Sequence, residues 1–324
     1  MSYEAVDCVD AGTDYCPCYL ADTNNCIICS QLQGKVFCDC INWKGVCIYQ
    51  EYKWNGSKPK EPRENINAKV IKNELIDEKQ LFLKIKVTKT MARELNQPGS
   101  YIFLRDSNCP DFFDTPMSIM FSDETNETID ILVQIKGTKT KNLTNNTNFT
   151  MRAPYFNGII GLKNIKAISN KNCLIVARGI AQAPAVLVAK KLKYSGNNTT
   201  VLLDRGNLNI KLPKKYFEEL GCNIIDINLI ENRNFTDNAG SVISNIIAEH
   251  DIKLIFSAGS DLVHKSIIGI KNNHSGEILF SCTNNANICC GEGVCGSCSK
   301  RLKDGRRIKA CKAQIDPVDI LGGI

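Results

Sequence analysis

The sequence predicts a multidomain β plus α/β chain, in which an antiparallel β-barrel precedes a doubly wound α/β domain and a cysteine-rich segment lies at each end. Three observations predict this fold class. Short stretches of alternating apolar and polar residues recur between residues 68 and 135. Continuous apolar stretches alternate with helical ones between residues 171 and 261, and most of the 17 cysteines lie before residue 50 or after residue 288. Alternation of strands and helices is typical of a parallel sheet covered on both faces.

The first 60 residues predict a cysteine-rich module followed by a linker. A segment this short and poor in large apolar side chains is not expected to build its own core. A metal centre bound by thiolates, either zinc or an iron–sulfur cluster, would hold it together. This predicts a second metal site at Cys8, Cys16, Cys18, Cys26, Cys29, Cys38, Cys40 and Cys47. The alternatives are a loop packed on the next domain and disulfides formed on oxidation. Residues Glu51 through Asn65 are charged, contain Pro59 and Pro62, and predict the linker.

The next region, residues 61–165, predicts short strands joined by turns. Leu81 to Val87 alternates with period two, which indicates a half-buried strand, and Ile129 to Ile135 alternates again. Tyr101 to Leu104 predicts another strand after the Pro98-Gly99 turn. Regularly spaced short strands with turn signals favour an antiparallel barrel.

Residues 166–275 predict an α/β domain. Lys171 to Ala177 is the continuous apolar strand expected in a parallel sheet, and Ala185 to Leu192 predicts the helix that follows. Further strands are expected at 199–204 and 254–258, and helices at 242–250 and from Ser260 onward. Ligands of such domains bind at the carboxyl ends of the strands. Asp204, at one such end, is interpreted either as an acceptor for a ribose hydroxyl or as a solvated turn residue.

The last region, residues 276–324, carries the most specific motif. Four cysteines are spaced Cys290-x4-Cys295-x2-Cys298-x12-Cys311, which is the plant-type spacing for a 2Fe–2S cluster. Glycines between them allow the tight wrap and leave backbone N–H groups free to bond sulfur. A structural zinc site would use two short Cys-x2-Cys pairs, whereas one occurs here. Cys289 is expected to be a buried thiol outside the ligand set.

Composition narrows the class of protein. The formal net charge is +6, from 40 basic and 34 acidic residues, and it is spread along the chain, so nucleic-acid binding is not expected. The N-terminus has no apolar signal segment, and the longest apolar stretch, residues 174–189, is too short to span a membrane. We therefore expect a cytoplasmic protein, in which many cysteines indicate metal or redox chemistry.

The order of barrel, α/β domain and ferredoxin-type cysteine loop resembles the iron–sulfur flavoprotein electron-transfer subunits of dihydroorotate dehydrogenase and sulfide dehydrogenase, within the ferredoxin reductase superfamily. The resemblance covers about residues 68–320. It implies an FAD-binding barrel at 61–165, an NAD-binding domain at 166–275 and a 2Fe–2S module at 276–324, and it leaves the module and linker of residues 1–60 outside the family.

The flavin motifs of that family match in part. Thr115, Pro116, Met117 and Ser118 stand where the family has Arg-Pro-x-Ser, with threonine in place of the arginine. Gly137 and Thr138 match a Gly-Thr element near the flavin diphosphate, where small residues let N–H groups approach phosphate. Asn157 and Gly158 resemble the turn that leads into the nucleotide domain. These residues are the expected FAD contacts.

The nucleotide motifs differ more. The family's glycine-rich loop reads Ala177-Arg178-Gly179-Ile180-Ala181-Gln182-Ala183-Pro184 here, with one glycine left. The family's Cys-Gly-Pro element reads Ala258-Gly259-Ser260. Gly179, Ala181, Ala183, Pro184 and Gly259 are the expected contacts of a nicotinamide nucleotide, whose binding these substitutions weaken or abolish.

The resemblance implies an oxidoreductase subunit that moves electrons between a nicotinamide nucleotide (NAD or NADP), FAD and a 2Fe–2S cluster and passes them to a partner. The expected partner is a catalytic oxidoreductase subunit or a ferredoxin. No nucleophile–base pair is found, because none of the histidines lies in a recognised motif. The alternative is a non-catalytic iron–sulfur scaffold or redox sensor that kept the reductase fold.

Overall fold

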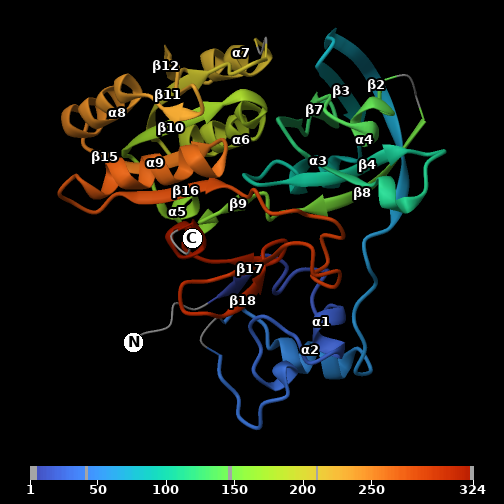
Figure 1. The fold of residues 1–324 in the computed structure, drawn as a ribbon. Helices are drawn as coiled ribbons and strands as arrows, with labels where there is room; N and C mark the ends of the chain where they lie inside the picture. Colours follow the sequence, from blue (N-terminus) through green and yellow to red (C-terminus); the bar gives the residue numbers. More distant parts are fainter. Residues whose placement is uncertain (1–5, 41–42, 145–147, 209–210, 322–324) are drawn as a thin grey trace.

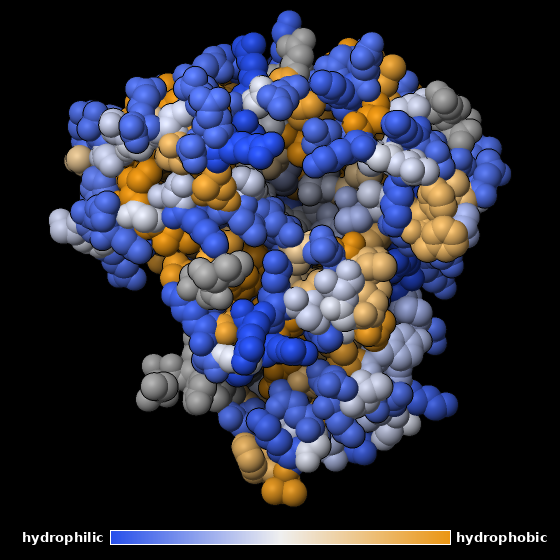
Figure 2. All heavy atoms as spheres, in the orientation of Figure 1, coloured by the Kyte–Doolittle hydropathy of each residue, from blue (hydrophilic) through white to orange (hydrophobic). Residues whose placement is uncertain are grey.

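The computed structural model describes residues 6–40, 43–144, 148–208 and 211–321. The antiparallel sheet and the α/β domain lie side by side, and the cysteine-rich ends of the chain lie together against both (Figure 1). In the described residues no helix is long and apolar enough to cross a membrane. Hydrophilic residues predominate on the face seen in Figure 2.

The first domain is a half-barrel. Among the described residues its strands are ordered β5-β4-β8-β2-β3-β7-β6, all antiparallel. The bounds are β2 Asn65–Asp77, β3 Gln80–Lys86, β4 Tyr101–Asp106, β5 Thr115–Ser118, β6 Phe121–Asp123, β7 Thr128–Gln134 and β8 Asn148–Tyr155. The helical turns in this domain are α3 Lys89–Glu94, η2 Asp111–Phe113 and α4 Thr138–Lys141. The three predicted strands are confirmed as β3, β4 and β7.

The predicted barrel is confirmed only as a half-barrel, and the prediction that β3 is half-buried is wrong. Leu81, Leu83 and Ile85 face the inside of the half-barrel, while Phe82 packs with the core of the α/β domain. Both faces of the strand are therefore covered. Its alternation arose from Lys84, whose charge pairs with buried Asp130.

The second domain is a parallel sheet with helices on both faces. Among the described residues the strand order is β12-β11-β10-β15-β16-β9, with β9 alone antiparallel. The strands are β9 Ile159–Ile160, β10 Asn172–Arg178, β11 Asn198–Asp204, β12 Asn223–Asp226, β15 Ile252–Ala258 and β16 Leu279–Thr283. The helices are α5 Leu162–Ala167, η3 Gly179–Ala181, α6 Gln182–Tyr194, α7 Leu212–Glu219, α8 Asp237–Glu249 and α9 Asp261–Asn272. A small hairpin, β13 Ile230–Glu231 and β14 Asn234–Phe235, precedes α8.

Alternating side chains of the central strand β10 divide the core. Ile175 points to the face covered by α6 and α7, and Leu174 points to the face covered by α8 and α9. The strand order reverses between β10 and β15, so the loops after these two strands meet at the switch point where such sheets bind ligands. The predicted nucleotide loops, after Arg178 and after Ala258, lie there.

The two ends of the chain are joined by a short strand pair. β1 Asp7–Cys8 pairs with β19 Ala313–Gln314. The C-terminal module also contains the hairpin β17 Ser299–Arg301 and β18 Arg307–Lys309 and the helix α10 Pro317–Leu321. The N-terminal module contains α1 Tyr19–Asp22, η1 Gln31–Gln33 and α2 Ile48–Trp54.

One expectation for the N-terminal segment is wrong. It has a small core, in which Leu32, Ile48 and Tyr52 are buried and three cysteines pack against them. The segment predicted as a linker begins inside α2 and then runs as irregular, mostly exposed chain to β2. Arg63 is an exception within it, since it is 6% exposed and buried among charges of the opposite sign.

Candidate redox site

A cavity of about 400 Å³ lies between the half-barrel and the switch point of the parallel sheet. Its walls combine apolar side chains with a few polar groups, as expected for a cofactor site. The surface is hollowed between these two domains in Figure 2. The residues that line it include Tyr101, Thr115, Pro116, Met117, Ser118, Lys136, Gly158, Ala181, Ala183, Pro184, Asn285 and Ile288.

The predicted flavin segment borders this cavity. Thr115, Pro116, Met117 and Ser118 form β5, the edge strand that pairs with β4. Gly137 and Thr138 lie beside it without lining it, and their neighbours Lys136 and Thr140 do line it. The N–H of Gly137 donates to the Thr140 hydroxyl at 3.2 Å, which begins α4 at that point.

Tyr101 supplies a polar group with no partner in the protein. Its side chain is buried and lines the cavity, and among the described residues nothing accepts from or donates to its hydroxyl. Burial raises the pKa of this phenol well above its ordinary value, so it remains a neutral donor. Buried polar groups nearly always have a partner, and a cofactor carbonyl or ring nitrogen would provide one. The residues present therefore fit a flavin.

The turn residues Asn157 and Gly158 have different surroundings. Gly158 lines the cavity, and a Cβ there would lie 2.8 Å from the carbonyl oxygen of Gly99, so only glycine fits. The Asn157 amide instead donates to the carbonyls of Ala310 and Ala313 at 2.6 and 2.9 Å. Asn157 is fully buried and joins the half-barrel to the C-terminal module, away from the cavity.

The altered nucleotide loop folds as a helical turn. Gly179 begins η3 with a φ of +59° and has open space around its Cα. Ala181, Ala183 and Pro184 line the cavity at the start of α6. Gly259 does not line the cavity. Its carbonyl accepts from the Asn285 amide at 2.9 Å, and Asn285 lines the cavity.

One of the two interpretations of Asp204 made from the sequence is wrong. It is 5% exposed, so it is not a solvated turn residue. Its carboxylate accepts from Arg178 Nε at 2.7 Å, from the Gly206 N–H at 2.7 Å and from the Leu229 N–H at 3.0 Å. The carboxylate is therefore used within the protein and holds the loop after β10 against β11.

A buried histidine lies behind the same loops. His264 Nδ1 is 2.7 Å from the Ser257 hydroxyl, and Nε2 is 3.2 Å from both the Thr283 hydroxyl and the Asn285 amide. Burial lowers the pKa of His264 to about 4, so the ring is neutral near pH 7. His264 lies in no recognised motif, although a histidine one turn into the helix after Ala258-Gly259-Ser260 was a usable signal.

The predicted cluster cysteines come together at the loop before β17. The Cys311 thiol is hydrogen-bonded to both Cys290 and Cys298, and these bonds lower the pKa of Cys290 to about 4 and of Cys298 to about 6. Cys295 is hydrogen-bonded to Cys290. Thiolates are the form that iron binds. Cys298 and Cys311 are buried, whereas Cys295 is exposed. Four thiols are the donor set of a 2Fe–2S cluster, but among the described residues no three such side chains are arranged to hold a metal ion, so this cluster stays a prediction.

The backbone of the loop has the predicted glycine conformations. Gly291, Gly293 and Gly296 have φ values of +75°, +78° and +78°, and the Glu292 N–H donates to Cys290 Sγ at 3.3 Å. The prediction that Cys289 is buried is wrong, because its side chain is exposed. Its neighbour Cys290 is half-buried.

A buried ionic network, which was not predicted from the sequence, lies beside this loop. Arg63 bonds Asp10 at 2.8 Å and Glu292 at 3.2 Å, and Lys312 bonds Glu292 at 2.9 Å and also pairs with Asp10. Lys312 is completely buried. A glutamate inside the cysteine loop and a lysine next to Cys311 were the available signals.

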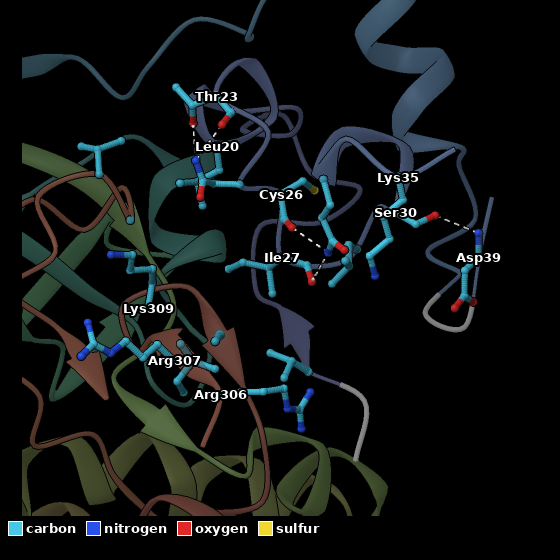
Figure 3. A pocket seen from close by; sticks show the side chains of 18 residues that line it. Leu20, Thr23, Cys26, Ile27, Ser30, Lys35, Asp39, Arg306, Arg307 and Lys309 are labelled. Carbon is cyan, nitrogen blue, oxygen red and sulfur yellow. Dashed lines mark hydrogen bonds between the residues drawn. The ribbon is translucent and has the colours of Figure 1, made fainter. Parts of the chain in front are cut away.

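The N-terminal cysteines lie on the other side of that network. Among the described residues no three His, Cys, Asp or Glu side chains are arranged to hold a single metal ion, so this metal site stays a prediction. A cavity of about 730 Å³ lies between the module and the C-terminal hairpin. Figure 3 shows Leu20 and Cys26 on one side of it and Arg307 and Lys309 on the other.

The chain was compared with family models, curated proteins and solved structures. No family model matches the chain. Over 217 residues it is 25% identical to the electron transfer subunit of dihydroorotate dehydrogenase B (NAD(+)) of Caldanaerobacter subterraneus subsp. tengcongensis, covering 64% of this chain and 78% of that protein.

Two solved structures share the fold. The NADH-dependent reduced ferredoxin–NADP oxidoreductase, described for flavin-based electron bifurcation, superposes with a TM-score of 0.59 at 19% identity, covering 75% of this chain and 85% of that one. Phthalate dioxygenase reductase superposes with a TM-score of 0.50 at 12% identity, covering 77% and 95%. The resemblance seen in the sequence is confirmed: the chain has the ferredoxin reductase fold and is a distant homologue of the dihydroorotate dehydrogenase B electron-transfer subunit.

Proposed function

We propose that the chain is an electron-transfer flavoprotein subunit that holds FAD in the cavity between its two sheets and a 2Fe–2S cluster at Cys290, Cys295, Cys298 and Cys311. FAD, when bound, takes an electron pair as hydride and releases it singly, and a 2Fe–2S cluster carries single electrons. In this proposal the domains are residues 1–60, 61–165, 166–275 and 276–324.

One observation carries the proposal: the cavity and the cysteine loop share a wall. Ile288 lines the cavity and packs against both the aromatic group of Tyr101, Phe103 and Tyr155 and the group that contains Cys298 and Cys311. Tyr101 stacks on Tyr155 with ring centroids 5.2 Å apart. A flavin held at Tyr101 would therefore lie directly in front of the cluster loop.

The residues around the cavity have separate tasks in this proposal. Tyr101 and Ser118, paired across β4 and β5, orient the flavin. Lys136 offers a cation to its phosphates in place of the missing arginine of β5. Ala181 and Pro184 border the side from which a nicotinamide ring would approach, and neutral His264 fixes Asn285 at that side. A catalytic oxidoreductase subunit or a ferredoxin would take electrons at the exposed Cys295 edge.

The test is the visible spectrum of anaerobically purified protein before and after NADH, with Cys311→Ala and Cys222→Ala compared. Cys222 lies in the α/β domain outside both sites, as a matched thiol. We expect flavin and iron–sulfur bands that bleach with NADH, loss of 2Fe–2S bands in Cys311→Ala with flavin retained, and no change in Cys222→Ala.

Two other results would change the proposal. Flavin bands that bleach with dithionite and not with NADH would leave an electron carrier with another donor. Iron–sulfur bands without any flavin would overturn the flavoprotein proposal and favour the scaffold or sensor, which the missing arginine at Thr115 and the single glycine of the nucleotide loop also favour.

A further inference from the structure

Two cysteines of the N-terminal module lie in contact on an exposed loop. The Sγ atoms of Cys38 and Cys40 are 3.6 Å apart and hydrogen-bonded, and both side chains are exposed. Because they are two residues apart, their Cα atoms lie at most about 7 Å from each other, close to the upper limit for a disulfide. A small movement of the two sulfurs would therefore allow them to join.

The loop that carries this pair is fixed to a buried serine. The Ser30 hydroxyl donates to the Phe37 carbonyl at 2.9 Å and accepts from the Asp39 N–H at 2.9 Å. Its bond to Asp39 is drawn in Figure 3. The Ser30 carbonyl also accepts from the Lys35 N–H at 3.1 Å. Since Phe37 and Asp39 flank Cys38, these bonds hold one of the two sulfurs at a defined place on the loop.

Access and strain make this pair reactive. Thiol–disulfide exchange requires a sulfur that another disulfide can reach, and both sulfurs of the pair are exposed. Cys16 and Cys18, which have the same spacing in the same module, are half-buried. A disulfide between residues two apart closes a small ring, and strained or exposed disulfides are the readily reduced ones. Cys38 and Cys40 are therefore suited to alternate between dithiol and disulfide.

Large apolar side chains surround the pair on the surface. Val36 is 98% exposed, Phe37 55% and Trp43 60%, and each lies within three residues of one of the two cysteines. Figure 2 shows hydrophobic side chains protruding at the lower end of the molecule, where the N-terminal module lies in Figure 1. Grouped apolar side chains on a surface mark contacts with another macromolecule. The surroundings of the pair thus favour a polypeptide as the carrier of the disulfide.

We propose that Cys38 and Cys40 form a thiol–disulfide exchange site for a disulfide carried by another polypeptide. One cysteine sulfur attacks the substrate disulfide: a bond forms between the chain and the substrate, the substrate S–S bond breaks, and one substrate thiol leaves with the proton of the attacking thiol. The second cysteine then attacks the mixed disulfide and releases the other substrate thiol with the second proton.

The pair is thereby oxidised by two electrons, and the substrate disulfide is reduced by two. A polypeptide dithiol reverses both steps. The exchange uses neither the flavin nor the 2Fe–2S cluster, so it goes beyond the proposed function.

The test uses full-length protein that is reduced and purified under anaerobic conditions, and two probes. One probe is a synthetic peptide with a single disulfide between cysteines flanked by apolar residues, and the other is glutathione disulfide. After the reaction, free thiols are blocked with N-ethylmaleimide and the protein is digested with trypsin. Cleavage after Lys35 and Lys44 gives a peptide of residues 36–44, in which Cys38 and Cys40 are the only cysteines.

We expect the synthetic peptide to oxidise residues 36–44, so that this fragment lacks two hydrogens and carries no blocking group, while an equal amount of reduced probe appears. Cys40→Ser should accumulate a mixed disulfide between Cys38 and the probe. Phe37→Ala should slow the reaction with the synthetic peptide several-fold, and more than the reaction with glutathione disulfide. Cys222→Ser, in the α/β domain, should react as the wild type does.

Three results would overturn this inference: blocking groups on both cysteines of residues 36–44 after both probes, a disulfide from Cys38 or Cys40 to a cysteine outside this fragment, or bound zinc or iron that decreases in Cys40→Ser. Reaction with glutathione disulfide alone, or an equal effect of Phe37→Ala on both probes, would overturn the polypeptide as substrate. Visible spectra of the same samples are a separate readout: oxidation of residues 36–44 in a protein without flavin would sustain the exchange site and overturn the flavoprotein proposal.

Discussion

Gly291 is the residue where the cysteine loop depends most on the absence of a side chain. A Cβ there would lie 2.5 Å from Tyr155 Cε1 and 2.8 Å from Phe103 Cε2, and the φ of +75° already disfavours any other residue. Gly296 has a similar φ of +78°, but its nearest neighbour would be Lys309 Nζ at 3.7 Å. The two glycines share the backbone requirement and differ in crowding.

We therefore predict that Gly291→Ala costs the backbone penalty of about 1–2 kcal/mol and in addition displaces the loop from the aromatic wall. The expected result is loss of most of the 2Fe–2S absorbance per chain. Gly296→Ala carries the backbone penalty alone and should keep the 2Fe–2S absorbance. Equal cluster content in the two variants, measured by iron analysis and visible spectra, would contradict the importance of this contact.

His264 links the nucleotide loops to pH. Its pKa falls from an ordinary 6.5 to about 4 because the ring is buried. The unfolded chain therefore binds a proton below pH 6.5 that the folded protein refuses until about pH 4, so stability is full above pH 6.5 and declines as the pH falls.

We predict that this residue removes about 2 kcal/mol of stability between pH 7.5 and pH 5.0. His264→Asn, which keeps polar atoms near Ser257 and Thr283, should show a smaller loss over the same interval. Unfolding midpoints in urea at the two pH values measure the difference. The same pH dependence in the variant would assign the loss to other groups.

At the scale of elements, the contact between the N-terminal module and the cysteine loop includes a buried ionic network. A buried ion pair adds little over an apolar contact, but removal of one partner leaves the others uncompensated and costs about 3–5 kcal/mol. Lys312 is the central group, since it is completely buried and contacts both Asp10 and Glu292.

Lys312→Met should consequently release the module. We expect amide hydrogen exchange in residues 7–63 to accelerate by the equivalent of about 3 kcal/mol or more, while amides of β10 and β15 keep their protection. Lys215→Met is the control, because its pair with Glu219 is exposed on α7 and contributes less than about 0.5 kcal/mol. Unchanged exchange in Lys312→Met would show that β1–β19 pairing alone holds the module.

At the scale of the molecule, the sequence predicted what periodicity and spacing determine. Strands β3, β4, β7 and β10 and helix α6 lie where their apolar patterns put them, and the cysteines spaced as in ferredoxins meet at one loop. The start of α8 was missed: Thr236 caps the helix by accepting from the Ala239 N–H, but Gly240 in its first turns concealed it.

What the sequence could not provide were contacts between charges far apart in the chain. Arg63 was predicted only as part of a charged linker, although it lies between Asp10 and Glu292. Asp204 was interpreted as an acceptor for a ribose hydroxyl or as a solvated turn residue, although its carboxylate accepts from Arg178 and from two backbone N–H groups. Polar residues carry no periodicity that reveals a distant partner, so burial of a charge becomes visible only in three dimensions. Tyr101 was placed in a strand, but its unpartnered hydroxyl could not be foreseen.

The pairing of β1 with β19 has a consequence for how the protein is made. Chains fold from their N-terminal end as they leave the ribosome, yet Asp7–Cys8 have no strand partner until Ala313–Gln314 emerge, and Asp10 has no Lys312. The N-terminal module is therefore completed only after residues 313–314 have been synthesised. Until then its eight thiols are open to oxygen and to metal ions. A ribosome that stalls after the α/β domain would leave a chain in which β1 has no β19 to pair with.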